Sequence, residues 1–373
     1  MTAGMTGAAT LHPEVWARLQ ARRARLPHAL LLAGQRGLGK LALAQAFVAG
    51  LLCEQPDDTG HACGHCLACR WREQGNHPDF RCLQPAALAE AEATSEATAN
   101  PAPEEKTKKA SQQITIDQVR GLEEFFNVGT HRQGLRIILI HPAEAMNRNT
   151  ANALLKTLEE PASDTLFVLV SHEPVRLLPT IRSRCQVVPV AVPGRQVAQA
   201  WLSANGLAEA GAWLALAGGA PLLAAELADE AAGGKPAAKG QAGKASVAGH
   251  WLQTLVLQLS QPLQGEVSAD ALAAAARLDG VLKDSKAQAG LPQVVLWSQK
   301  WLLDLLLARL AQAPRYFVRE QATIQALAQR SEAVRLLRFE RQLLRWRREA
   351  EQPLNARLFL EVFFLDYFAL FRR

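Results

Sequence analysis

The sequence predicts an α/β domain with a mostly parallel sheet at the N-terminal end, followed by parts that are entirely helical. Three apolar runs, residues 28–33, 136–140 and 166–170, have the unbroken apolar character of strands covered on both faces. Helical stretches around residues 41–52 and 152–160 alternate with them. Alternating strands and helices form parallel sheets, because each connection crosses back over the sheet. We therefore expect the α/β domain to continue to about residue 190.

Length and composition favour several folded domains. The chain has 373 residues, of which 49% are hydrophobic and 20% charged. A net charge of +6 is small over this length and does not by itself indicate nucleic-acid binding. No apolar run approaches the roughly 20 residues that span a bilayer, and the N-terminus lacks the order of a signal peptide. We expect a cytoplasmic protein with no membrane partner.

Two stretches are poor in large apolar side chains. Residues 86–113 predict a flexible surface insertion, and residues 231–248 predict a linker between domains, because neither could bury enough apolar surface to become ordered. Beyond the linker, residues 294–310 and 354–371 read as long apolar helices. The second is apolar nearly all round, which predicts burial in a bundle or an interface.

The segment after the first predicted strand matches the phosphate-loop pattern G-x-x-x-x-G-K-[ST] up to its last position. Gly34, Gly37 and Gly39 would let backbone N–H groups surround phosphates, and Lys40 would pair with the terminal phosphate. Leu41 stands where a hydroxyl should hold Mg²⁺. A glycine turn that only packs the strand against the helix is the alternative, and weak nucleotide binding through Lys40 stays open.

The acidic half of such a site is also missing. An acidic residue should close the next core strand and position Mg²⁺ and the attacking water. Here the strand runs into His141-Pro142, and the nearest acid, Glu144, comes two residues later. Two metal-handling positions are therefore lost, and we do not expect this chain to hydrolyse ATP alone.

Four cysteines within 17 residues predict a structural zinc site. Cys53, Cys63, Cys66 and Cys69 follow the spacing C-x9-C-x2-C-x2-C. Four thiolates form a closed tetrahedron with no open position for water, which indicates structure rather than catalysis. A reducing cytoplasm disfavours disulfides. Four cysteines without a ligand remain the alternative.

Three nearby residues are expected to have no metal role. His61 and His65 are substitute ligands by type, but we expect exposed imidazoles in a local turn. Cys82 lies outside the spacing and is expected to be an ordinary buried thiol.

Several stretches together resemble the bacterial clamp-loader subunits of the AAA+ class. The resemblance runs through residues 15–192 apart from the insertion, and beyond them the chain matches only in being helical. The stretches that carry it are LPHALLLAGQRGLGK (26–40), the C-x2-C-x2-C excursion after the first helix, ANALLKTLEEPASDTLFVLVSHEP (151–174) and LLPTIRSRC (177–185). The most specific pieces are residues 152–161 and 183–185.

The resemblance implies an order of domains. An AAA+ P-loop-like domain is expected over residues 1–192, with the zinc module at 53–69 and the flexible insertion. A small helical lid domain is expected over 193–230. The linker and an all-α collar domain over 249–373 would complete the chain.

The resemblance also implies a role for the S-R-C motif. In the family its arginine points across a subunit boundary at the γ-phosphate of ATP held by a neighbour. Arg184, with Ser183 beside it, would thus act in another chain's catalysis, as an arginine finger. The alternative is that Arg182 and Arg184 only solvate a turn before a strand at residues 186–190.

Departures from the family pattern indicate a member that does not hydrolyse ATP. Motor subunits keep the Mg²⁺-binding Ser/Thr and a D-E pair, which Leu41 and His141-Pro142 replace. A lid arginine is missing too, because no Lys or Arg occurs between Leu207 and Gly234. Ser171 stands at the family's sensor position and is otherwise a strand cap.

The resemblance implies partners: gamma/tau motor subunits and a delta subunit in a hetero-pentamer and, through the assembly, primed DNA and the sliding clamp. Zn²⁺ would be this chain's own cofactor, and the chain would be a non-catalytic part of a DNA-directed DNA polymerase (nucleotidyltransferase) holoenzyme. Arginines between residues 335 and 348 are expected on a solvated helix face. The alternatives are an ATP-hydrolysing motor and a free-standing zinc protein that binds DNA.

Overall fold

The computed structural model describes residues 11–90, 111–127, 134–231, 251–264, 270–284 and 290–372. Most of the predicted insertion at 86–113 and nearly all of the predicted linker at 231–248 lie outside the described residues, although residues 86–90 are helical. The chain divides into two compact units, Met1–Trp201 and Leu202–Arg373. Each unit is described by itself.

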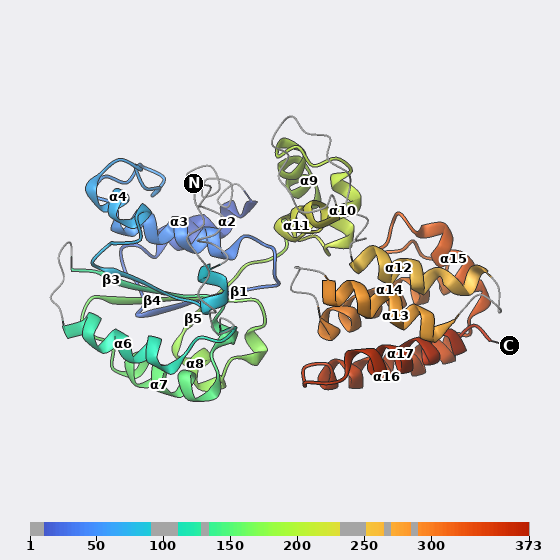
Figure 1. Ribbon diagram of the computed structural model, residues 1–373. Coiled ribbons are helices and arrows are strands. Elements are labelled where there is room, and N and C mark those ends of the chain that lie inside the picture. Colours follow the sequence, from blue (N-terminus) through green and yellow to red (C-terminus); the bar gives the residue numbers. More distant parts are fainter. Residues whose placement is uncertain are drawn as a thin grey trace, which may run out of the picture. The chain divides into compact units, whose positions relative to one another are not determined.

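The first unit is built on a five-stranded sheet of order β2-β3-β4-β1-β5, in which every neighbouring pair is parallel (Figure 1). The strands are β1 Ala29–Ala33, β2 Phe80–Leu83, β3 Arg136–Ile140, β4 Thr165–Ser171 and β5 Gln186–Pro189. All residues of β1, β3 and β4 are buried. The predicted parallel α/β architecture is confirmed, and these are the three strands that the apolar runs predicted.

Helices cover both faces of this sheet. Figure 1 shows α2, α3 and α4 on one side and α6, α7 and α8 on the other. Their bounds are α2 Pro13–Ala21, α3 Lys40–Leu52, α4 Leu67–Glu73, α6 Ile116–Asn127, α7 Arg148–Glu159 and α8 Pro179–Arg184, and the short 3-10 helices η1 Ala143–Ala145 and η2 Pro174–Arg176 lie in the loops. Leu31, Ile138 and Phe167 belong to the core that α6, α7 and α8 close. Covered faces explain why these strands are continuously apolar.

Strand register brings three loops together at one edge of the sheet. Ala33 at the end of β1 pairs with Ser171 of β4 and with Pro189 of β5. Ile140 at the end of β3 pairs with Leu169 of β4. The segments that follow β1, β3 and β4 therefore begin side by side, at the carboxyl edge where ligands of open α/β sheets bind.

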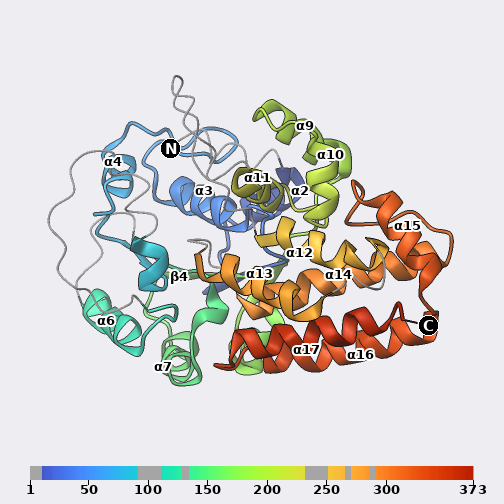
Figure 2. The ribbon, with the colours of Figure 1, turned by 45° about the vertical axis from the view of Figure 1, so that its right-hand side comes forward.

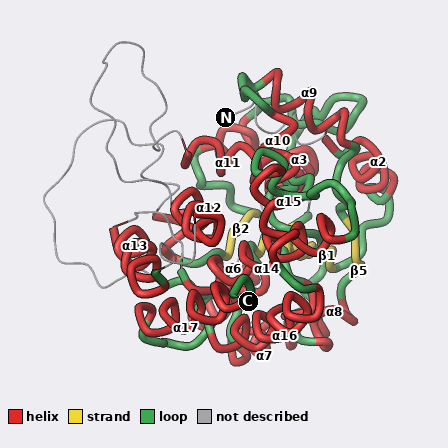
Figure 3. Tube along the Cα trace, turned by 90° about the vertical axis from the view of Figure 1, so that its right-hand side faces the viewer, coloured by secondary structure: helices red, strands yellow, loops and turns green. Residues whose placement is uncertain are grey.

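Every regular element that the structure describes in the second unit is helical, as the red and yellow colouring of Figure 3 shows. The helices are α10 Ala210–Leu216, α11 Pro221–Ala231, α12 Trp251–Ser260, α13 Ala271–Asp284, α14 Leu291–Arg309, α15 Gln321–Arg330, α16 Ala333–Glu349 and α17 Ala356–Ala369, with the 3-10 helix η3 Gln261–Gln264, and α9 Arg195–Ala204 crosses the boundary between the units. The predicted helical remainder is confirmed. Its finer division into lid and collar stays a prediction.

Aromatic packing holds α14, α16 and α17 together. α16 and α17 run side by side in Figures 1 and 2, and Phe339 and Trp346 of α16 pack against Phe363 of α17. Trp301 of α14 donates from Nε1 to the Tyr367 hydroxyl at 2.9 Å. The Tyr367 hydroxyl in turn donates to a backbone carbonyl of α12 at 2.8 Å. The buried indole and phenol are thus both hydrogen-bonded, as burial requires.

The prediction for α17 was burial in a bundle or an interface, and one side of the helix is buried within this chain. Phe363 and Phe364 are fully buried, but Leu358 is 60% and Leu365 49% exposed. Residues 358, 362 and 365 follow one another at four and three positions, so they form one exposed apolar stripe.

Among the described residues, no single helix has the length and apolar character to cross a membrane. The consecutive helices α10 and α11 reach that length only together, and they bend by 106° at their junction.

A buried carboxylate organises the loop after α14. Asp304 is fully buried, and its two oxygens accept the backbone N–H groups of Arg315, Tyr316 and Phe317 at 2.7, 2.9 and 2.7 Å. Hydrogen bonds to a charged acceptor are the strong ones, because they satisfy the charge and the amides together.

We predict that Asp304→Asn lowers the free energy of unfolding by about 2–4 kcal/mol, because the amide offers one acceptor where three donors converge. Urea denaturation followed by circular dichroism measures the change. Asp117→Asn on α6, whose side chain is 84% exposed, is the control and should cost less than about 0.5 kcal/mol. Equal losses for both variants would contradict the assigned role of Asp304.

Candidate functional site

The phosphate-loop segment leaves β1 at Gly34 and enters α3 at Lys40. Gly37 and Gly39 have φ values of 80° and 82°, a backbone conformation that residues other than glycine rarely adopt. A Cβ at Gly34 would lie 2.4 Å from the carbonyl oxygen of Val190. Backbone geometry alone therefore requires these glycines, which leaves both the phosphate-loop and the glycine-turn interpretations in place.

Lys40 is turned back onto its own loop. Its side chain is 2% exposed, and Nζ donates to the Gln35 carbonyl at 2.6 Å. Burial lowers the pKa of Lys40 to about 8, while the Glu144 carboxylate acts in the opposite direction. The ammonium group of Lys40 thus already has a hydrogen-bond acceptor within its own loop.

The two positions expected to handle a metal carry no oxygen ligand. Leu41 is the second residue of α3, and His141 directly follows β3. The Nε2 atoms of His141 and His172 lie 3.3 Å apart, with the rings nearly perpendicular at 81°. Glu144, the nearest acid in the sequence, accepts the backbone N–H of His172 at 2.8 Å. Two imidazoles therefore stand where a carboxylate was expected.

Both imidazoles are held neutral. Burial, followed by the neighbouring His172, lowers the pKa of His141 to about 4. Burial, followed by the charges of Lys40 and Arg36, lowers the pKa of His172 to about 3. Because a neutral imidazole has one donor and one acceptor nitrogen, one ring can donate to the other across the 3.3 Å.

Several buried polar atoms of this cluster have no hydrogen-bond partner among the described residues. They are Ser171 Oγ, His141 Nδ1, His172 Nδ1 and Glu144 Oε2. Ser171 ends β4, is fully buried, and accepts the Gly34 amide through its backbone oxygen at 3.3 Å. Its hydroxyl is not a strand cap, because nothing described accepts or donates to it. Several polar side chains therefore lie together at this sheet edge. The side chains of residues 41 and 141, however, supply no oxygen ligand for Mg²⁺.

Arg184 lies at the end of α8 and makes two contacts within its own domain. Its Nη2 is 2.5 Å from Glu159 Oε1 at the end of α7, and its Nη1 donates to the Thr180 carbonyl at 3.0 Å. Ser183 Oγ also donates to Thr180 at 3.0 Å. The Arg184 side chain is 34% exposed. Arg184 is thus an ion-paired helical residue, which the interpretation as a solvated turn did not anticipate.

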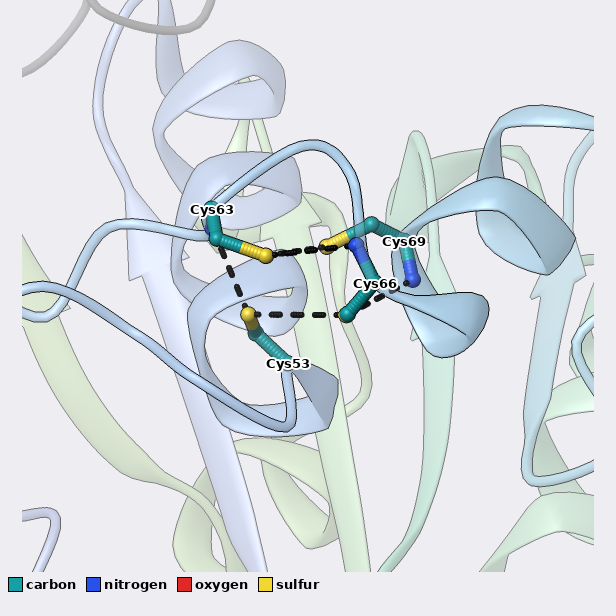
Figure 4. A group of neighbouring side chains, drawn as sticks. All are labelled: Cys53, Cys63, Cys66 and Cys69. Carbon is teal, nitrogen blue, oxygen red and sulfur yellow. Dashed lines mark hydrogen bonds between the residues drawn. The ribbon is translucent and has the colours of Figure 1, made fainter.

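The four cysteines converge as predicted (Figure 4). Cys53 follows α3, Cys66 caps the start of α4, and Cys69 lies within α4. The Sγ atoms of Cys53 and Cys66 are 3.8 Å apart, those of Cys63 and Cys69 are 4.0 Å apart, and all four lie within 4.8 Å of one another. Tetrahedral zinc with bonds of roughly 2.3 Å places its sulfurs about 3.8 Å apart. The arrangement fits such a metal ion.

Backbone amides point at three of these sulfurs. The N–H groups of Cys63, Cys66 and Cys69 donate to the Sγ atoms of Cys53, Cys63 and Cys66 at 3.3, 3.4 and 3.4 Å. Amide donors, that of His65 first, lower the pKa of Cys63 to about 6, whereas burial raises the pKa of Cys53 and of Cys69. The thiolate form that binds metal is thus favoured most at Cys63.

Two expectations for the surrounding residues were wrong. His61 is half-buried, because its ring packs edge-on against Trp16 at 4.2 Å, whereas His65 is exposed as expected. Cys82 is exposed rather than buried, because β2 is the edge strand of the sheet and its central residues face solvent.

Sequence reasoning missed Glu159 and His172. The pair Glu159-Glu160 is visible in the sequence, but only the packing of α7 against α8 selects Glu159 as the partner of Arg184. His172 directly follows the third apolar run, and the pairing of β3 with β4 brings it to His141.

Comparison with known proteins gives one consistent result for the N-terminal part. Residues 12–193 match the family described as "DNA polymerase III, delta subunit". DNA polymerase III subunit delta' of Pseudomonas aeruginosa is 41% identical over 220 residues, which cover 57% of this chain and 59% of the relative. The Escherichia coli subunit delta' is 37% identical over 177 residues, 47% of this chain and 46% of the relative. The match thus spans about half the length of these relatives.

Among solved structures, a DNA polymerase III gamma subunit-related protein from Thermotoga maritima is 17% identical, with a TM-score of 0.42. The comparison covers 96% of this chain and 99% of that one.

The neutral histidine pair predicts a pH-dependent stability. An unfolded histidine takes up a proton below about pH 6.5, whereas His141 and His172 resist protonation until about pH 4 and about pH 3. Between these values the unfolded state binds more protons, so lowering the pH destabilises the fold. His172→Gln should reduce the loss of unfolding free energy between pH 7 and pH 5 by roughly 1–2 kcal/mol.

Chemical denaturation at the two pH values measures this effect, and His28→Gln, which changes an exposed histidine, is the control. If His172→Gln loses as much stability as the unsubstituted chain, the neutral pair does not set the pH dependence.

Proposed function

We propose that the chain is a delta-prime subunit of a bacterial clamp loader, because its residues 12–193 match the DNA polymerase III delta-subunit family and its N-terminal half resembles delta' subunits. In this role it helps an ATP-driven complex to place the sliding clamp on primed DNA. The proposed partners are gamma/tau motor subunits and a delta subunit in a hetero-pentamer. The primed DNA and the clamp would be bound by the assembled complex.

The observation that carries this proposal is that one domain combines a phosphate loop without side-chain oxygens at its two metal positions with a partly exposed arginine. Leu41 and His141 offer no oxygen to Mg²⁺, and Lys40 is occupied by the Gln35 carbonyl. Arg184 instead keeps 34% of its side chain exposed. This contrast supports a chain that does not hydrolyse ATP and that acts on ATP bound elsewhere.

The proposed role of Arg184 is to reach the γ-phosphate of ATP in the neighbouring motor subunit. Water attacks the γ-phosphorus there, the bond to the ADP oxygen breaks, and charge develops on the phosphoryl oxygens. A guanidinium suits this task because it is always charged and can donate to two oxygens together. Ser183 next to it bonds to the Thr180 carbonyl and thereby supports the turn of α8 that presents Arg184.

For the cysteine cluster we propose one structural zinc ion held by Cys53, Cys63, Cys66 and Cys69. The S–S distances and the three amide donors support it. Zinc would join the end of α3 to the start of α4 and supply folding energy, but no open coordination position for catalysis.

The helical unit supports a role in assembly. We propose a lid over residues 193–230 and a collar over residues 249–373 that holds the ring together. The exposed stripe of Leu358, Val362 and Leu365 on α17 is the kind of apolar helix face that packs against another helix.

We predict that Arg184→Ala abolishes the contribution of this chain to ATP turnover in a complex reconstituted with motor and delta subunits from the same organism. Loss of an arginine finger costs on the order of 10³-fold at the site it serves, so total turnover should fall by the share of one site. Arg182→Ala, which removes another arginine of α8, is the matched control. Size-exclusion chromatography checks that each complex assembles, and unchanged turnover with Arg184→Ala would refute the trans-acting role.

We also predict one zinc ion per chain by elemental mass spectrometry of the purified protein. Cys66→Ser should lose the metal and lower the melting temperature, because the remaining sulfurs no longer close the tetrahedron. Cys82→Ser, which alters an exposed cysteine outside the cluster, should keep both. A zinc content near zero in the unsubstituted chain would remove zinc from the proposal.

A further inference from the structure

Arg184 is folded back against its own domain. Its guanidinium reaches the carbonyl of Thr180, four residues earlier in the same short helix, and the carboxylate of Glu159 on α7. The first contact draws the side chain back along α8, and the second draws it toward the end of α7. The guanidinium of Arg184 has five N–H donors, and two of its nitrogens already contact oxygens of this chain.

The position of Glu159 explains why its carboxylate attracts the arginine. Glu159 is the last residue of α7, where unpaired carbonyl groups create a partial negative charge. A second negative charge there is unfavourable unless a cation lies beside it. Arg184 supplies that cation at 2.5 Å, whereas the adjacent Glu160, also exposed, forms no ion pair with any residue that the structure describes.

We propose that Glu159 is a positioning residue that holds Arg184 in an inactive orientation. The γ-phosphate of a neighbour's ATP then competes with the Glu159 carboxylate for the same guanidinium. This inference rests on the proposed function. Engagement then requires an exchange of one anionic partner for another, with no covalent step in this chain. Glu159 acts only through Arg184.

The exposure of the pair suits such an exchange. The side chains of Arg184 and Glu159 are 34% and 48% exposed, so water can replace either partner without leaving a buried charge. Exposed ion pairs favour the paired state only by roughly two- to fivefold, which a phosphate group can overcome. A buried pair would hold the arginine too firmly for repeated cycles.

The test compares Glu159→Gln with Glu160→Gln in the complex of full-length chains reconstituted with motor and delta subunits. Glu159→Gln should raise ATP turnover at the one site that Arg184 serves by about two- to fivefold, because more of the arginine is free to engage. The total kcat of the complex should therefore rise by the share of that site, without a rise in KM. Glu160→Gln should change neither. In an Arg184→Ala background, Glu159→Gln should have no further effect, which a merely structural role of Glu159 would not produce.

The outcomes separate the two proposals. If Arg184→Ala lowers turnover but Glu159→Gln leaves kcat unchanged or lowers it, the role of Glu159 in holding Arg184 inactive is refuted and the proposed function stands. If Arg184→Ala has no effect, or the unsubstituted chain does not assemble with the motor subunits, both proposals fall. Melting temperatures of the free variants check folding, and the conservative variant Glu159→Asp, which keeps the charge, should give a kcat nearer to that of the unsubstituted chain.

Discussion

The parallel pairing of β1 with β4 on one side and β5 on the other is the constraint on which the rest of the first unit depends. Because the three strands end together, the loop after β1 lies against the end of β4 and against the segment that follows β5. The Gly34 amide bonds to Ser171, and the carbonyl of Val190 leaves no room for a side chain at Gly34. The sheet therefore dictates the loop's shape whether or not a nucleotide ever binds there.

This independence explains how the loop can persist while the chemistry around it changes. Glycines are retained by backbone crowding and positive φ angles, and Lys40 finds an acceptor within the loop. Positions 41 and 141 face no such backbone requirement, so a leucine and a histidine can occupy them. The neutral imidazoles of His141 and His172 fill the sheet edge without adding charge beside Lys40. The side chains at positions 41 and 141 thus offer no oxygen to a divalent metal, although the backbone of the loop is kept.

The parts of the fold that the sequence predicted are those in which one local pattern decides the outcome. Strands β1, β3 and β4 are buried on both faces and so are continuously apolar, and the cysteine spacing alone brought four sulfurs together. Strand β2 was not predicted, because its middle residues are exposed at the sheet edge and form no apolar run. For the same reason, the prediction that Cys82 is buried was wrong. The contacts of His172 and Glu159 depend on tertiary packing, which no local pattern encodes. The domain boundaries and the roles of the site residues stay predictions.

The placement of α3 has a mechanical consequence. This helix is about 20 Å long, begins at the lysine of the loop, and ends next to Cys53 of the sulfur cluster. With the proposed zinc ion bound, this helix would be fastened at both ends, to the sheet edge through the loop and to α4 through the cysteines. Any rearrangement at the loop must be absorbed by the few residues between Gly34 and Lys40. A helix fastened at both ends in this way would keep the phosphate-loop segment and the cysteine cluster at a fixed separation.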